Sequence, residues 1–175
     1  MAIGAVRRRG VLLFNYNDLM QGGLTIVPTP IGNLADMPPR AAEALHAADV
    51  VCAEDTRVTG RLLAALGIEG KRFERLDENV MGERVDQIVR RVQQGERIAY
   101  CSDAGMPGVS DPGLRLVAAA RQAGIPVEVL PGPTAAATAY VASGTTSPSF
   151  YFGGFFPRKA KARADLLVRR KIKER

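Results

Sequence analysis

The sequence predicts an α/β fold with an open, mostly parallel sheet and helices on both faces, and two observations support that prediction. Short apolar runs alternate with longer segments of helical spacing, and the connections between them are short. The apolar runs are typical of strands that helices cover on both sides. Alternation of this kind is the pattern of βαβ units. No internal repeat or low-complexity tract interrupts it.

The expected strands are short, and Gly, Pro or charged residues end each of them. Four are clearly marked, and one, around residues 71–76, is weakly marked. In chain order the strands are expected at residues 24–27, 49–53, 71–76, 97–101 and 125–130.

The expected helices follow these strands. Asp36 is the expected N-cap of the first helix, with Pro38 and Pro39 in its first turn. Glycines close several of the others, as at Gly67 and Gly124. The helices are expected at residues 38–48, 59–66, 83–94, 112–123 and 135–142.

Four loops follow strands in the same sense, so they should meet at the carboxyl edge of the sheet, where ligands bind in open α/β folds. They span residues 28–36, 54–57, 102–113 and 131–134. The third, which we call the central loop, holds three Gly, two Pro, two Ser and two Asp. Because such a loop is costly to hold in one shape, we expect it to be the functional centre.

Composition limits the possible partners. The net charge is +6 with a pI near 9.7, and the positive excess lies in Arg7–Arg9 and in residues 158–175. This favours an anionic partner, nucleic acid above all. No apolar run approaches the ~20 residues of a membrane span, and the apolar part of the start is too short for a signal peptide. We therefore expect a cytoplasmic protein with no membrane partner.

Several kinds of site are disfavoured. Cys52 and Cys101 each end an apolar run and are expected to be reduced core residues, and His46 is expected on a helix surface. No metal site is predicted, because no Cys/His spacing suits one. No dinucleotide fingerprint or P-loop is present.

Five motifs occur in the order and spacing of one family: VPTPIGNL (27–34), AEDTR (53–57), SDAGMP (102–107), SDPG (110–113) and LPGPTA (130–135). The chain resembles the ribosomal RNA small subunit methyltransferase I family, within the tetrapyrrole-methylase superfamily. That resemblance implies S-adenosylmethionine-dependent 2′-O-methylation of a cytidine in 16S rRNA of the 30S subunit, and a homodimer. It covers roughly residues 24–167.

The resemblance also implies site residues. S-adenosylmethionine would contact the central loop, the turn at 131–134 and the first loop, and Arg57, Arg158 and Lys159 would bind rRNA phosphates. Solvated charge is the alternative for these basic residues, and helix N-caps are the alternative for Asp103 and Thr134. The implied cofactor contacts are Ile31, Ser102, Asp103, Met106, Thr134 and Ala135.

Methyl transfer to a hydroxyl needs alignment and removal of a proton. Glu54, Asp55 and Asp103 are the candidate bases. Because neighbouring side chains at a strand end point to opposite faces, Glu54 and Asp55 are not expected to serve one site together. An Asp55–Arg57 ion pair that holds the loop is the alternative role for Asp55.

The expected organisation is a flexible leader (1–23), an N-terminal α/β methylase domain (24–146) and the start of a truncated second domain (147–175). Five of the ten aromatic residues lie at 150–156, where a closing strand and helix of the same domain is the alternative. The chain departs from the family in lacking histidine at 75–79 and in being shorter. Two other functions remain open: methylation of a tetrapyrrole or other small molecule, and a non-catalytic RNA-binding or ribosome-assembly module.

Overall fold

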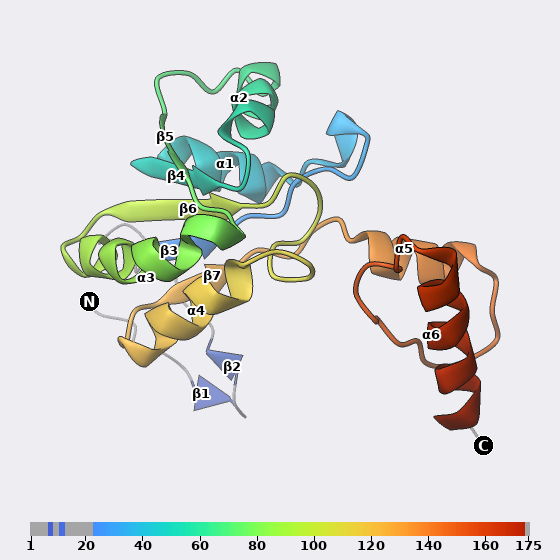
Figure 1. Ribbon diagram of the computed structural model, residues 1–175. Coiled ribbons are helices and arrows are strands. Elements are labelled where there is room, and N and C mark those ends of the chain that lie inside the picture. The colour runs from blue at the N-terminus through green and yellow to red at the C-terminus, as the bar shows by residue number, and fades with distance from the viewer. Residues whose placement is uncertain (1–6, 9–10, 13–22, 174–175) are drawn as a thin grey trace.

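A five-stranded sheet forms the centre of the structure (Figure 1). The computed structural model describes residues 7–8, 11–12 and 23–173 of the chain. The strand order is β5-β4-β6-β3-β7, and every pairing between neighbours in this sheet is parallel. The predicted open parallel sheet is confirmed, and the weakly marked strand at residues 71–76 is present as β5.

The strands are close to their expected positions, and the helices expected to start at residues 59 and 83 begin three and five residues earlier, at Thr56 and Glu78. The strands of the sheet are β3 (Gly23–Ile26), β4 (Val50–Ala53), β5 (Arg72–Arg75), β6 (Arg97–Cys101) and β7 (Val127–Val129). The helices are α1 (Pro39–Ala47), α2 (Thr56–Ala65), α3 (Glu78–Gln93), α4 (Gly113–Gln122), α5 (Ala135–Ala142) and α6 (Ala160–Lys173).

Capping explains the shifted helix starts. The Asp55 side chain accepts from the Arg57 backbone N–H and starts α2 three residues early, and Asp77 starts α3 in the same way. Asp36 is not the cap of α1: it ends a 3₁₀ turn (Leu34–Asp36) capped by Asn33, and α1 begins after Pro38.

A hydrophobic core lies on each face of the sheet. On one face, Leu24, Ile26, Ile98 and Tyr100 pack against α3 and α4. On the other, alternate residues of the same strands pack against α1 and α2, so helices cover both faces, as predicted (Figure 1). Cys52 and Cys101 are both buried and unpaired, and burial raises the pKa of each thiol to about 12. This confirms their expected role as reduced core residues.

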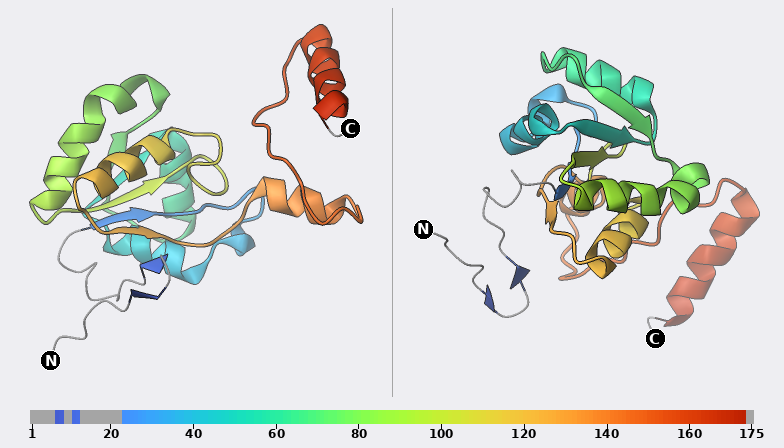
Figure 2. Two further views of the ribbon diagram at one scale, coloured as in Figure 1. Left: turned by 90° about the horizontal axis from the view of Figure 1, so that it is seen from below. Right: turned by 90° about the vertical axis from the view of Figure 1, so that its left-hand side faces the viewer.

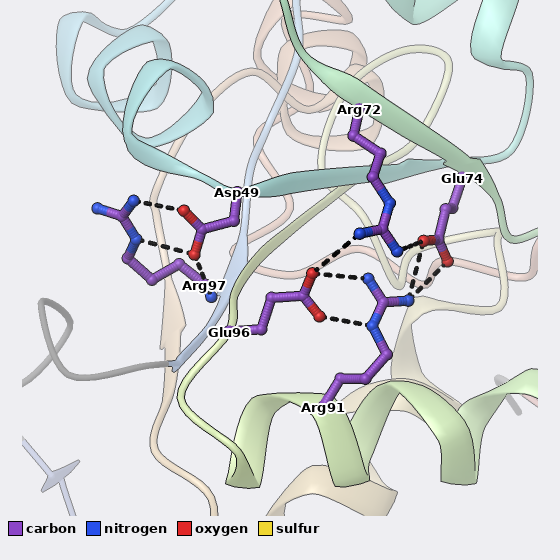
Figure 3. A network of polar contacts seen from close by, with 6 residues as sticks. All are labelled: Asp49, Arg72, Glu74, Arg91, Glu96 and Arg97. Carbon is purple, nitrogen blue, oxygen red and sulfur yellow. Dashed lines mark hydrogen bonds and ion pairs between the residues drawn. The ribbon is translucent and has the colours of Figure 1, made fainter.

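Ion pairs hold the edge strand β5 to the helix layer below it (Figure 3). Arg91 of α3 donates to the Glu74 carboxylate at 2.8 and 2.9 Å and to Glu96 at 2.9 Å. Nearby, Arg97 pairs with Asp49 at the start of β4. All three groups of the Arg91 cluster are largely buried, which makes this cluster a structural element rather than solvated surface charge.

The segments outside the sheet differ in character. Helices α5 and α6 lie beyond the carboxyl edge of the sheet in both Figure 1 and Figure 2 (left). Helix α5 has no buried residue, and Phe150, Phe155 and Phe156 are exposed. Most of the predicted leader lies outside the described residues, but Arg7–Arg8 (β1) and Val11–Leu12 (β2) pair as antiparallel strands. Within the described residues, no helix is long and apolar enough to cross a membrane.

Candidate cofactor cavity and its second chamber

All four loops at the carboxyl edge line one cavity of about 530 Å³, which we call the first cavity. This confirms the prediction that these loops meet at one edge. Every residue that the resemblance implies for cofactor binding lines the first cavity. Its lining is Ile31, Glu54, Ser102–Met106, Val109–Asp111, Thr134–Ala136, Phe152, Gly154 and Phe155.

Thr29 joins the first loop to the central loop. Its backbone forms a two-way bridge with Gly105, with N···O distances of 3.0 and 3.1 Å, and its buried hydroxyl donates to the Ser102 carbonyl at 3.2 Å. Gly105 has φ +83°, and a Cβ there would lie 3.2 Å from the Ile31 side chain. The backbones of the two loops therefore approach closely, and glycine is the residue that permits it.

Asp111 holds the central loop from within. Its carboxylate accepts from the backbone N–H of Gly108 at 2.6 Å and of Gly113 at 2.8 Å, and from the Tyr100 hydroxyl at 3.3 Å. A Cβ on Gly113 would lie 2.8 Å from the Asp111 carboxylate, so only glycine fits there. Hydrogen bonds to the Asp111 carboxylate, near the C-terminal end of the central loop, therefore hold this loop in one conformation.

The helix-cap alternative is wrong for Asp103, and for Thr134 it holds in position only. Helix α4 begins after Pro112, and the Asp103 carboxylate instead accepts from the Asp55 backbone N–H at 3.1 Å, which ties the central loop to the second loop. Thr134 stands at the N-cap position of α5, but its side chain makes no capping hydrogen bond. Both residues border the first cavity.

Ser102 carries an unpartnered hydroxyl. The residue is 5% exposed, and its Oγ is the one buried side-chain N or O atom among the described residues that lacks a hydrogen-bond partner. An unsatisfied buried hydroxyl costs free energy, about 1–3 kcal/mol. Because Ser102 lines the first cavity, a ligand in that cavity could satisfy its hydroxyl.

A second cavity of about 460 Å³ shares a wall with the first, since Glu54 and Asp103 line both. Its lining is Glu54, Asp55, Thr56, Arg57, Arg75 and Asp103. Glu54 and Asp55 therefore line one cavity here, whereas only Glu54 also borders the first cavity. The alternation of side chains ends with β4 at Ala53, and Asp55 has turned into the N-cap of α2.

Asp55 and Glu54, two of the three candidate bases, differ in environment. Asp55 is bound by the Arg57 side chain at 2.7 and 3.0 Å, which confirms the predicted ion pair and holds the pKa of Asp55 far below its ordinary value. The pKa of Glu54 is raised, first by burial and then by the nearby carboxylates, Asp111 foremost. Glu54 is thus the better proton acceptor of the two.

The structure separates the predicted phosphate-binding residues. Arg57 borders the second cavity, whereas Arg158 and Lys159 precede α6 and line neither cavity. Sequence reasoning missed Arg75, which occupies a strand end that was too weakly marked to place. It also missed Phe152 and Phe155 as cavity residues, although the aromatic cluster at 150–156 was a visible signal.

A parallel sheet whose carboxyl-edge loops enclose a cavity of this size defines an α/β domain that binds a small ligand. The chain belongs to the tetrapyrrole methylase family: the sequence model for Tetrapyrrole (Corrin/Porphyrin) Methylases matches residues 23–168. This is a family of S-adenosylmethionine-dependent methyltransferases.

Similar curated proteins are named Ribosomal RNA small subunit methyltransferase I. That of Escherichia coli O157:H7 is 49% identical over 150 residues, covering 86% of this chain and 52% of the relative. That of Vibrio cholerae is 50% identical over 145 residues, covering 83% of this chain and 50% of the relative. The chain thus spans about half the length of the curated relatives that it matches.

Solved structures show the same fold. Uroporphyrin-III-C-methyltransferase from Thermus thermophilus superposes with a TM-score of 0.55 at 26% identity, over 71% of this chain and 54% of that one. Cobalt precorrin-4 methyltransferase superposes with a TM-score of 0.53 at 19% identity, over 75% of this chain and 53% of that one.

Proposed function

We propose that this protein is an S-adenosylmethionine-dependent rRNA methyltransferase that methylates the 2′-hydroxyl of a cytidine in 16S rRNA of the 30S subunit. The observation that carries the proposal is the first cavity, which is lined by all the cofactor residues that the family resemblance implies. The names of the curated relatives support rRNA as the substrate class.

The residues of the first cavity fit this cofactor. Ile31, Met106 and Phe155 supply apolar surface, and the Thr134 and Ser102 hydroxyls supply polar contacts, the mixture that small-molecule sites use. Ser102 Oγ is buried without a partner, as expected of a group that a ligand satisfies. The carboxylates around the cavity complement the positive charge of the cofactor.

When bound, S-adenosylmethionine supplies an electrophilic methyl group on a sulfonium. The chain's own contribution is to hold the loops in one geometry, through Thr29 and Asp111, so that an acceptor hydroxyl can be aligned with that methyl group. Glu54, on the wall between the two cavities, is the group positioned to take the hydroxyl proton.

The test combines binding and transfer. Calorimetry should show that the protein binds S-adenosylhomocysteine, and tritiated methyl should appear on 30S particles that lack the modification. Transfer to precorrins but not to 30S particles would instead favour the small-molecule alternative. Absence of S-adenosylhomocysteine binding would favour a non-catalytic module.

Ser102→Ala sharpens the binding test because it is expected to affect protein stability and ligand affinity in opposite directions. Removing an unsatisfied hydroxyl should not lower, and should slightly raise, the stability of the ligand-free protein. Losing a hydrogen bond to the ligand should weaken S-adenosylhomocysteine binding about 3- to 10-fold. Ser143→Ala, which lies outside the cavity, is the control. Equal affinity for wild type and Ser102→Ala would show that the hydroxyl does not contact the cofactor.

The same proposal includes a cytoplasmic homodimer with residues 24–146 as its cofactor-side domain. Exposed apolar side chains of α5 and of the segment that follows it, among them Val141, Phe150 and Phe156, support an association that covers these residues. Light scattering on the purified protein tests the dimer: a monomer at micromolar concentration contradicts it.

A further inference from the structure

The second cavity differs in chemistry from the first. Its walls carry carboxylates, two guanidinium groups and one threonine, and no aliphatic or aromatic residue lines it. A flat macrocycle would find no apolar surface there. A polar, charged ligand would find partners on every side, and Glu54 and Asp103 border both that ligand and whatever occupies the first cavity.

The two arginines of the second cavity are held in orientation by neighbouring carboxylates. Arg57 donates through Nε and Nη2 to Asp55, and Arg75 donates through Nε at 2.7 Å and through Nη2 to Asp77. Their side chains are nonetheless 87% and 63% exposed. Within residues 23–173, neither Nη1 donates a hydrogen bond. Each guanidinium is therefore oriented and retains donors for an anion such as a phosphate.

Glu54 faces a different set of charges. Burial is the largest effect that disfavours its ionised form, and the charges of Asp111, Asp103 and Asp77 add to it, whereas a hydrogen bond from the Asp103 backbone N–H opposes them. Asp55, the adjacent carboxylate, is already neutralised by Arg57. Among the described residues, Glu54 has no ion-pair partner.

We propose that the second cavity is the acceptor subsite for a nucleotide, in which Arg57 and Arg75 bind phosphates and Glu54 accepts the proton of the ribose hydroxyl. This rests on the proposed function. During transfer the hydroxyl oxygen bonds to the methyl carbon, the carbon–sulfur bond breaks with its electron pair left on sulfur, and the proton passes to the Glu54 carboxylate. The sulfonium becomes a neutral thioether, so charge and atoms balance.

The phosphate role is tested with a matched pair on one strand. Arg75 and Arg72 both lie on β5 with similarly exposed side chains, but only Arg75 lines the cavity. Arg75→Ala should raise KM for 30S particles about 10-fold and lower the slope of log affinity against log salt by about 1. S-adenosylhomocysteine affinity should be unchanged, and Arg72→Ala should change neither rRNA quantity. Arg75→Lys, which keeps the charge, should recover part of the KM effect and guards against a folding defect.

The proton-acceptor role is tested with Glu54→Gln. Single-turnover transfer should slow by about 10²-fold or more, with S-adenosylhomocysteine affinity within 3-fold of wild type. The wild-type rate should fall as pH drops through the raised pKa of Glu54, and this acidic limb should vanish in the variant. Glu69→Gln, an exposed glutamate outside both cavities, should behave as wild type.

The outcomes separate the two proposals. If wild type neither binds S-adenosylhomocysteine nor methylates 30S particles, the proposed function fails. If wild type does both, but Arg75→Ala matches Arg72→Ala in KM and salt slope, the acceptor subsite is overturned. Full activity of Glu54→Gln with its acidic limb intact overturns the proton-acceptor role.

Discussion

The close approach of two site loops makes Gly132→Ala an informative substitution. A Cβ on Gly132 would lie 2.4 Å from Pro28 Cγ and 2.5 Å from Pro28 Cβ. Carbon atoms pack at about 3.5–4 Å, so the turn and the first loop must part by about 1 Å. Pro28 is a buried, rigid ring, and the next residue, Thr29, is bonded to Gly105 and Ser102.

The expected cost follows from that separation. Overpacking of a fixed contact costs about 1–3 kcal/mol of unfolding free energy. The same shift displaces the turn that carries Thr134 relative to the central loop, so S-adenosylhomocysteine affinity should fall about 10-fold or more. The measurements are urea denaturation, with m unchanged, and calorimetry.

Gly60→Ala is the matched control. Gly60 lies within α2, and a Cβ there would meet no atom within 4 Å. It should raise stability by up to about 1 kcal/mol through helix propensity and leave binding unchanged. If Gly132→Ala is as stable as wild type and binds S-adenosylhomocysteine equally well, the two loops do not meet as described, and the cavity argument loses its basis.

Two further predictions concern the core. Arg91→Met should cost roughly 2–4 kcal/mol because it removes the largely buried arginine from Glu74 and Glu96 and leaves only the exposed Arg72 beside them, whereas Arg72→Met, which removes the exposed arginine and keeps Arg91, should cost under about 1 kcal/mol. Burial alone would raise the pKa of Glu74, but the arginine hydrogen bonds bring it below the ordinary value. The stability that ionised Glu74 contributes is therefore fully present above the pKa of an unfolded glutamate and is lost as pH falls through the folded pKa. Arg91→Met should flatten this acid dependence of the unfolding free energy in urea titrations. Equal costs for the Arg91 and Arg72 variants would contradict the argument. The thiols of Cys52 and Cys101, with pKa values of about 12, should react with a thiol reagent at neutral pH only as fast as the protein opens, and rapid labelling of the native protein would contradict their burial.

Elements defined by local pattern were predictable. The strand at residues 97–101 is apolar and flanked by charged or loop residues, and β6 occupies those residues. Helix α4 begins within one residue of its predicted start, because its apolar spacing and its closing Gly124 are both local signals. Helices α2 and α3 began earlier than predicted because their aspartate caps lie outside the apolar pattern.

The candidate site was predictable at the level of loops and not of individual roles. Strand direction alone implies that four loops share one edge, and the cavity lining bears this out. Which carboxylate is neutralised could be suspected from the spacing of Asp55 and Arg57. The hydrogen bond from the Asp55 backbone N–H to Asp103, 48 residues away in sequence, could not be predicted from the sequence.

The amino-acid sequence by itself determined the parallel α/β sheet, the loops that carry the site and the burial of the two cysteines, because periodicity, turn residues and apolar runs are local properties of a chain. Only the tertiary structure decided that Ser102 keeps an unpartnered hydroxyl, that Arg75 joins Arg57 beside a second cavity, and that Glu54 stands between the two cavities. These facts depend on distances between segments far apart in the chain. Such distances are fixed by packing and loop-to-loop hydrogen bonds, which no local pattern encodes.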